Sequence, residues 1–231
     1  MAAREKVSGF EKFKQTMATL SWPERIDYLW TYYKWVIGVV ILAVVVISII
    51  VSCIYHARLD TLFGGTCVNV EFTDEGDAYL SDDWFALLGG REGKEEVNYF
   101  STILQDPDST TNTETNAAAA MSVIVLIGTQ DLDYIIMDQI GMDYFGEREI
   151  FPSLEQVLSE QMLARMEDLL IYHTDEAGNT YPIAIDISEA AFIRNCAKND
   201  GPVYIAFPGN TDRLALSEEF LEYILDWVPA A

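Results

Sequence analysis

The feature that most constrains the fold of this chain is an uncharged apolar run near its N-terminus. Residues 35–55 read WVIGVVILAVVVISIIVSCIY, which is 21 residues without a charged side chain. As a helix, such a run crosses about 30 Å of hydrocarbon, because each residue adds about 1.5 Å. A helix buried in a soluble core seldom has this length. The run therefore predicts one transmembrane helix, with the lipid bilayer as its partner.

Basic residues are concentrated before the run, and this asymmetry predicts its orientation. Lysine and arginine near a transmembrane helix mark the cytoplasmic side. Residues 1–34 are therefore predicted to be a cytoplasmic tail, and the C-terminal part is predicted to be extracellular. After the run, only Arg58 occurs before Arg91, whereas the bases before it are Arg4, Lys6, Lys12, Lys14, Arg25 and Lys34.

The start of the membrane helix has a capping signal, and its processing has two interpretations. Ser21 and Glu24 form a capping box that predicts a helix running from there into the membrane. A 34-residue approach is long for a cleaved secretory signal, so we expect an uncleaved signal anchor. The alternative is a lipoprotein acylated at Cys53, since residues 50–53 loosely fit a lipobox. Both interpretations predict a single tether to the cell membrane.

The excess negative charge belongs almost entirely to the part after the membrane helix. Residues 1–60 carry 7 bases and 5 acids, so the remainder of the chain carries 7 bases and 32 acids. A domain with this balance repels phosphate backbones, and nucleic acid is therefore excluded as a partner. We expect the partner to be an extracellular protein or a small solute.

The three cysteines are too few to build a disulfide scaffold. Cys53 lies in the apolar run, so Cys67 and Cys196 are the only pair available for a bridge outside the cell. Whether that bridge forms depends on a distance that the sequence does not give. We expect core packing to hold the domain together in either case.

Strand and helix signals alternate through the acidic part. Two segments, 73–83 and 105–116, are predicted to be polar loops, and a turn at 175–179 predicts an antiparallel hairpin between its flanking strands. Residues 117–127 fit either a helix or a buried strand, and the four alanines favour the helix. Predicted strands are 67–72, 95–104, 133–137, 169–172, 181–187 and 203–207. Predicted helices are 82–88, 117–127, 153–169 (capped by Ser153), 188–197 and one capped by Ser217.

Alternating strands and helices predict an α/β fold with one three-layer domain of helices and sheet. We expect four segments: the cytoplasmic tail and juxtamembrane helix at 1–34, the transmembrane helix at 35–55, a linker at 56–65 and the extracellular acidic domain at 66–231.

Sequence support for catalysis is weak, so we expect a protein without enzymatic activity. The chain has no HExxH, GxSxG, P-loop or GxGxxG pattern, and only two histidines, His56 and His173. We predict no cofactor, no metal and no catalytic residue. Trp84 and Tyr99 are candidates for a ligand cleft, because aromatic faces stack on sugar rings; core packing is the alternative for both.

The acidic part contains several degenerate motifs, namely Asp131-Leu132-Asp133-Tyr134-Ile135-Ile136, Tyr144-Phe145, Phe151-Pro152-Ser153-Leu154, Tyr181-Pro182-Ile183-Ala184-Ile185 and Val203-Tyr204-Ile205-Ala206-Phe207. With these motifs it resembles type 2 extracellular solute-binding proteins. The resemblance implies a lobe of the periplasmic-binding-protein type. Such proteins bind solutes between two lobes of comparable size, and this chain has residues for one. The tail, with Asp27-Tyr28-Leu29-Trp30, also resembles that of uncharacterised membrane-anchored proteins of Gram-positive bacteria.

Three functions are compatible with these features. The first is a membrane-tethered extracellular binding or interaction module without catalytic activity. The second is the substrate-binding receptor of an ABC-type importer for a sugar or another small solute. The third is a cell-wall hydrolase, which the missing catalytic motifs disfavour.

Overall fold

The computed structural model describes residues 17–56, 59–104, 113–229 and divides the chain into two units, 1–58 and 59–231. Residues 1–16 of the expected tail and residues 105–112 of the expected loop lie outside the described residues.

The first unit contains the long helix α2 (Trp22–His56), which begins at the predicted capping box. The Ser21 amide and hydroxyl donate to the Glu24 carboxylate at 2.9 and 2.7 Å. Within α2, residues Lys34–Ile54 have a mean hydropathy of 3.2. The helix is long and apolar enough to cross a membrane, which is consistent with a signal anchor or a signal peptide.

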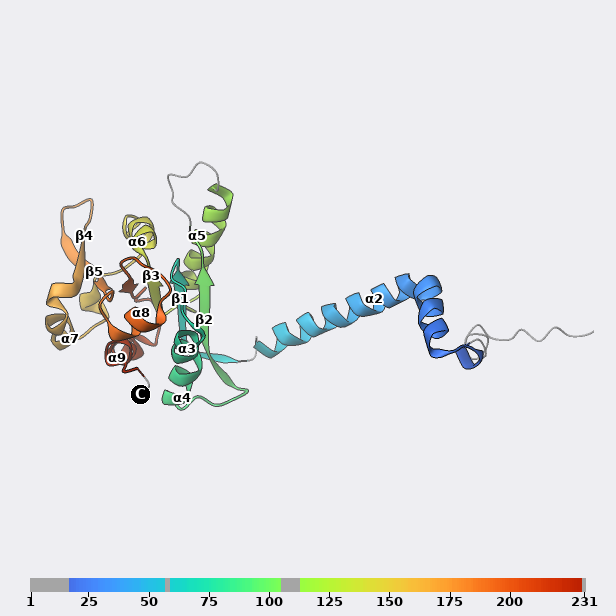
Figure 1. The fold of residues 1–231 in the computed structure, drawn as a ribbon. Coiled ribbons are helices and arrows are strands. Elements are labelled where there is room, and N and C mark those ends of the chain that lie inside the picture. Colours follow the sequence, from blue (N-terminus) through green and yellow to red (C-terminus); the bar gives the residue numbers. More distant parts are fainter. Residues whose placement is uncertain (1–16, 57–58, 105–112, 230–231) are drawn as a thin grey trace, which may run out of the picture. The chain divides into compact units, whose positions relative to one another are not determined.

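The second unit is an α/β fold around one mixed six-stranded sheet with the order β2-β1-β3-β6-β5-β4 (Figure 1). This confirms the predicted α/β class. β1 pairs in parallel with β2 and β3, whereas β6 and β5 join the sheet antiparallel. The strands are β1 (Asp60–Val68), β2 (Glu95–Thr102), β3 (Tyr134–Met137), β4 (Leu170–Thr174), β5 (Thr180–Asp186) and β6 (Tyr204–Ala206).

Helices contribute side chains to two hydrophobic clusters, one on each face of the sheet. Strand alternation sends Tyr134 and Ile136 of β3 into the first cluster and Ile135 and Met137 into the second. The first cluster contains residues of α4 (Trp84–Leu87), α8 (Ala191–Cys196) and α9 (Leu214–Leu225), and the second contains residues of α5 (Thr113–Gly128) and α6 (Gln139–Gly146).

Aromatic rings dominate the first cluster. Phe220 of α9 lies 5.0 Å from Phe63, 5.2 Å from Trp84 and 4.2 Å from Tyr134, measured between ring centroids. These residues come from α9, β1, α4 and β3, so one set of ring contacts joins the sheet to the helices on this face. Offset and edge-on ring pairs add to the burial energy of each ring.

The first strand begins earlier than predicted. β1 starts at Asp60, inside the segment 56–65 that was expected to be a linker, and the predicted strand 67–72 coincides with β1 only at Cys67 and Val68. Glycines at 64 and 65 suggested a linker, but here they permit close packing. A Cβ on Gly64 would lie 1.9 Å from the Asp131 carbonyl oxygen, and one on Gly65 would lie 1.9 Å from the Tyr134 ring.

The acidic segment 73–83, predicted to be a loop, is helical. Thr73 caps α3 (Asp74–Ala78) by accepting a hydrogen bond from the Gly76 amide, and a π-helical turn, Tyr79–Asp83, continues into α4. Acids in the first turn of α3 favour this helix because they interact with its N-terminal dipole.

The predicted helix over 153–169 is wrong as a single element. The segment contains a short 3-10 turn (Leu154–Gln156), α7 (Glu160–Arg165) and another 3-10 turn (Glu167–Leu169). Ser159 caps α7 by accepting from the Met162 amide at 3.2 Å. A second capping serine therefore starts a new helix where the apolar periodicity alone predicts continuation.

The C-terminal helix also differs in its start, because α9 begins at Leu214 and encloses Ser217. The Ser217 side chain is buried, and its hydroxyl has no hydrogen-bond partner among the described residues. The expected helix over 188–197 is shorter, since α8 begins at Ala191. The predicted hairpin is confirmed as β4 paired antiparallel with β5, and the helical interpretation of 117–127 is confirmed by α5.

Candidate functional site

The candidate site lies where the parallel strands end. β1, β2 and β3 run in the same direction, so their carboxyl ends meet at one edge of the sheet. The chain leaves β1 through α3 to reach β2 on one side, and returns through α5 to reach β3 on the other side. In α/β sheets, this kind of reversal leaves a crevice at the carboxyl ends where ligands bind.

Asn69 organises this edge. It follows β1 directly and has a φ of 59°, a left-handed conformation that asparagine tolerates better than most residues. Its backbone amide donates to the Thr102 carbonyl at 2.9 Å, and its side-chain oxygen accepts from the Leu104 amide at 2.6 Å. Asn69 therefore joins the end of β1 to the end of β2.

The same asparagine reaches the helix that follows β3. Its side-chain nitrogen donates to both carboxylate oxygens of Asp138, at 3.1 and 3.2 Å. Asp138 caps α6 by accepting from the Gly141 amide at 2.8 Å. The three strand ends are thus held together by a hydrogen-bonded amide and carboxylate.

A loop near the C-terminal end of α8 completes the edge. The Lys198 amide donates to the Glu71 carbonyl at 2.8 Å, and the Glu71 amide donates to the Asn199 side chain at 2.8 Å. Asn199 also donates to the Asn69 carbonyl. These bonds place Glu71 and Lys198 side by side on neighbouring backbones.

A pocket of about 240 Å³ opens between these segments. Two of its lining residues, Asn69 and Asn199, use their amides to hold the backbone. The side chains of Glu71, Lys198, Ser101 and Thr102 make no hydrogen bond or ion pair within the described part of the chain. The pocket lining is Asn69, Glu71, Ser101, Thr102, Ile103, Lys198 and Asn199.

The two aromatic candidates do not line this pocket. Trp84 is 1% exposed and packs among Phe63, Phe220 and Tyr223, so core packing accounts for it. Tyr99 is partly buried against the first cluster, and its hydroxyl donates to the Asp77 carboxylate at 3.1 Å. Burial, with Cys67 and Asp77 nearby, raises the pKa of Tyr99 far above its usual range.

The cysteine pair named as a possible disulfide is unbridged in the structure. Cys67 on β1 and Cys196 at the end of α8 are both buried and both free. Burial raises the pKa of the Cys67 thiol to about 12. Both thiols are therefore packed inside the first cluster. Cys53, the residue of the lipoprotein alternative, is an exposed free cysteine in α2.

His173 lies away from the candidate site, on β4. Its Nε2 is 3.9 Å from a Glu149 carboxylate oxygen, at the hairpin end of the sheet. Among the residues that the structure describes, no group of three or more histidine, cysteine, aspartate or glutamate side chains is placed to hold a metal ion.

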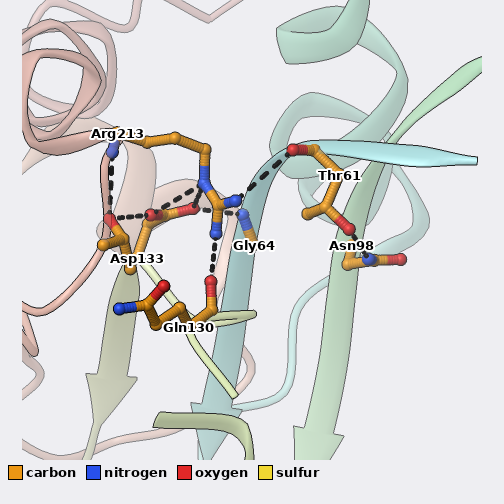
Figure 2. Close-up of polar contacts among 7 residues, drawn as sticks. Thr61, Gly64, Asn98, Gln130, Asp133 and Arg213 are labelled. Atoms are coloured by element: carbon orange, nitrogen blue, oxygen red, sulfur yellow. Dashed lines mark hydrogen bonds and ion pairs between the residues drawn. The ribbon is translucent and has the colours of Figure 1, made fainter. Parts of the chain in front are cut away.

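A buried ion pair joins Asp133, which precedes β3, to Arg213, which precedes α9. The Asp133 side chain is 0% exposed and accepts from the Arg213 guanidinium at 2.9 Å, the Gly64 amide at 2.7 Å and the Thr211 hydroxyl at 2.6 Å (Figure 2). Arg213 also donates to the Gln130 carbonyl at 2.6 Å. The Asp133 carboxylate thus accepts hydrogen bonds only from groups of the protein, so it serves as an internal contact of the fold.

The outer face of α5 is a second unusual surface. Met121, Ile124 and Val125 are exposed, although α5 carries no charged residue between Ala117 and Gly128. A helix that is apolar on every side is normally buried. The phenylalanine of β2, Phe100, and the following Ile103 are exposed as well.

Sequence reasoning did not single out the residues of the pocket. Asn69 fell inside a predicted strand, and Lys198 and Asn199 followed a predicted helix without a motif. One signal was present, since polar residues directly after parallel strands gather at a sheet edge.

Comparisons with protein families, with characterised proteins and with solved structures found no match to this chain.

Proposed function

We propose that this protein is a membrane-tethered module without catalytic activity that binds a protein or a small solute outside the cell. In this proposal α2 crosses the membrane as a signal anchor with the N-terminus in the cytoplasm. The acidic unit then forms an extracellular three-layer domain, comparable to one lobe of a solute-binding protein. The observation that carries the proposal is the pocket at the carboxyl ends of β1 and β2. The residues of this pocket come after a membrane-length apolar helix in the sequence.

The residues of the pocket support binding rather than catalysis. Its amides are already engaged in holding the backbone, and a binding site benefits from walls that are fixed before the ligand arrives. Its free groups are two hydroxyls, one carboxylate and one ammonium. Among the described residues, no histidine or carboxylate is hydrogen-bonded to the Ser101 or Thr102 hydroxyl, as activation of a nucleophile would require.

Surface labelling of cysteines introduced one at a time tests the topology. Glu176→Cys places a thiol on the exposed β4–β5 turn, and Asp27→Cys places one on the exposed part of α2 before the membrane run. A membrane-impermeant maleimide added to intact cells should label the first variant, and should label the second only after permeabilisation. The opposite pattern would invert the orientation and refute an extracellular domain. The mass of the membrane-bound protein then shows whether the N-terminus is retained.

The importer receptor remains a second candidate, because the carboxyl ends of the strands are where open α/β sheets bind small ligands. A receptor cleft requires two lobes, and the described residues form one sheet unit. Thermal denaturation of the full-length protein with a panel of oligosaccharides tests the receptor function. Stabilisation that grows with sugar concentration would support the receptor, as expected for a ligand that binds the folded state.

A further inference from the structure

We propose that the pocket at the carboxyl ends of β1 and β2 binds a small zwitterion of the α-amino acid type, with Lys198 facing the carboxylate and Glu71 facing the ammonium. This inference rests on the proposed binding function and adds the chemical class of the ligand.

Lys198 forms no ion pair with an acidic side chain among the described residues. The acidic unit has seven bases, and five of them contact an acidic side chain or an aromatic ring. Lys198 and Lys94 have no such contact among the described residues, and only Lys198 lines the pocket. The five engaged bases are Arg91, Arg165, Arg194 and Arg213, which form ion pairs, and Arg148, which lies over the Tyr144 ring.

Glu71 supplies the opposite charge at the same place. The backbones of Glu71 and Lys198 are joined by a 2.8 Å hydrogen bond, yet these two described side chains form no ion pair with each other. Both charged groups are exposed to the pocket and available to a ligand. A molecule that carries an ammonium and a carboxylate satisfies both groups at once, and charge-assisted hydrogen bonds of this kind are the strong ones.

The volume of the pocket limits the ligand to a small molecule. Its 240 Å³ lies below the range of about 300–1,000 Å³ that is typical of sites for larger organic ligands. The Ser101 and Thr102 hydroxyls can both donate and accept, so they suit the polar atoms of an amino acid.

The charge of the domain favours a zwitterion over a ligand that carries only a carboxylate or only an ammonium group. With 7 bases and 32 acids after residue 60, the domain has a net charge of 7 − 32 = −25 and repels a simple carboxylate at long range. A simple amine is attracted to many carboxylates across the surface, so the pocket has little advantage for it. A zwitterion has no net charge, so a site can select it only with a pair of groups that carry opposite charges.

Calorimetric titration of the full-length protein in detergent micelles tests this assignment. The probes are the twenty standard L-amino acids at millimolar concentration, with propionate and ethylamine as the two half-ligands. At least one amino acid should bind, and each half-ligand should bind about tenfold more weakly or worse, because one charge-assisted contact is lost.

Matched variants locate the site. Lys198→Met and Glu71→Gln should each weaken amino acid binding about tenfold or more, for the loss of one such contact. Lys94→Met and Glu92→Gln change the same residue types outside the pocket and should leave binding unchanged. Amino acid binding that is insensitive to Lys198→Met overturns the inference.

Failure of the ligand class can be told apart from failure of the binding function. If no amino acid binds but an oligosaccharide does, and Lys198→Met abolishes that binding, the zwitterion is wrong while the pocket remains a binding site. If neither panel binds, the zwitterion is refuted, and the pocket loses its support as a small-solute site.

Discussion

Replacement of Arg213 by methionine tests how much the buried ion pair with Asp133 matters for the stability of the domain. The substitution leaves the fully buried Asp133 carboxylate without its cation, while the Gly64 amide and the Thr211 hydroxyl still donate to it. Removing one partner of a buried pair costs about 3–5 kcal/mol. The two remaining donors and the 24% exposure of the Arg213 side chain place the expected loss near the lower end, at about 3 kcal/mol.

Thermal unfolding measures this loss in the full-length protein in detergent micelles. Near-ultraviolet circular dichroism follows the buried aromatic residues, and so reports on the acidic unit rather than on α2. This unit spans residues 59–231, and for domains of this size 1 kcal/mol shifts the melting temperature by about 2–4 °C. The variant should therefore melt about 6–12 °C below the parent protein.

An exposed ion pair provides the control. Arg194→Met removes the pair with Glu189, in which the two side chains are 65% and 85% exposed, and should cost less than about 1 kcal/mol. If Arg213→Met lowers the melting temperature no more than Arg194→Met does, the reasoning about the buried pair is refuted.

Three further predictions concern the strand ends and the thiols. Gly64→Ala should destabilise the domain by about 3 kcal/mol or more, because its Cβ meets a backbone carbonyl. In the control, Gly201→Ala, the added Cβ meets nothing within 4 Å and should be neutral. Equal melting temperatures of the two variants would contradict this. Asn69→Ala should be less stable than Asn69→Gly by about 1 kcal/mol in urea unfolding, since both lose the side-chain bonds and only alanine strains the left-handed backbone; the reverse order would exclude that strain. Burial raises the pKa of Cys67 to about 12, so the folded state favours the neutral thiol. This preference contributes to the stability of the fold below the ordinary pKa of a thiol. The contribution is lost as the pH rises towards 12. Iodoacetamide at pH 8 should therefore label Cys67 and Cys196 only after denaturation, as read by peptide mass; failure to label in denaturant without a reductant would indicate a disulfide instead.

The elements that sequence patterns predict well are those whose signals are local. The capping box at Ser21, the hairpin turn at 175–179 and the alanine-rich helix at 117–127 each depend on a few neighbouring residues, and each is present. The errors arise where local signals compete. Gly64 and Gly65 have the composition of a linker, and only the position of β3, about 70 residues away, shows that they lie in a strand packed too closely for a side chain.

The candidate site was harder to predict because its residues come from distant segments. Asn69 and Asn199 are 130 residues apart and meet only because β1 and the loop after α8 share a sheet edge. The same holds for Asp133 and Arg213, whose separation of 80 residues leaves no pattern in the sequence. Aromatic residue type was a poor guide to the candidate site, since Trp84 is buried in the core where a ligand does not reach it.

The position of β6 has a consequence for the order in which the domain assembles. β6 is the last strand in the chain, yet it lies between β3 and β5 and joins them. Until Tyr204–Ala206 have emerged, a nascent chain has two disconnected sets of strands, each with an open edge. A nascent chain should therefore need protection from aggregation until its final segment arrives, and a premature stop before β6 should yield no partial domain.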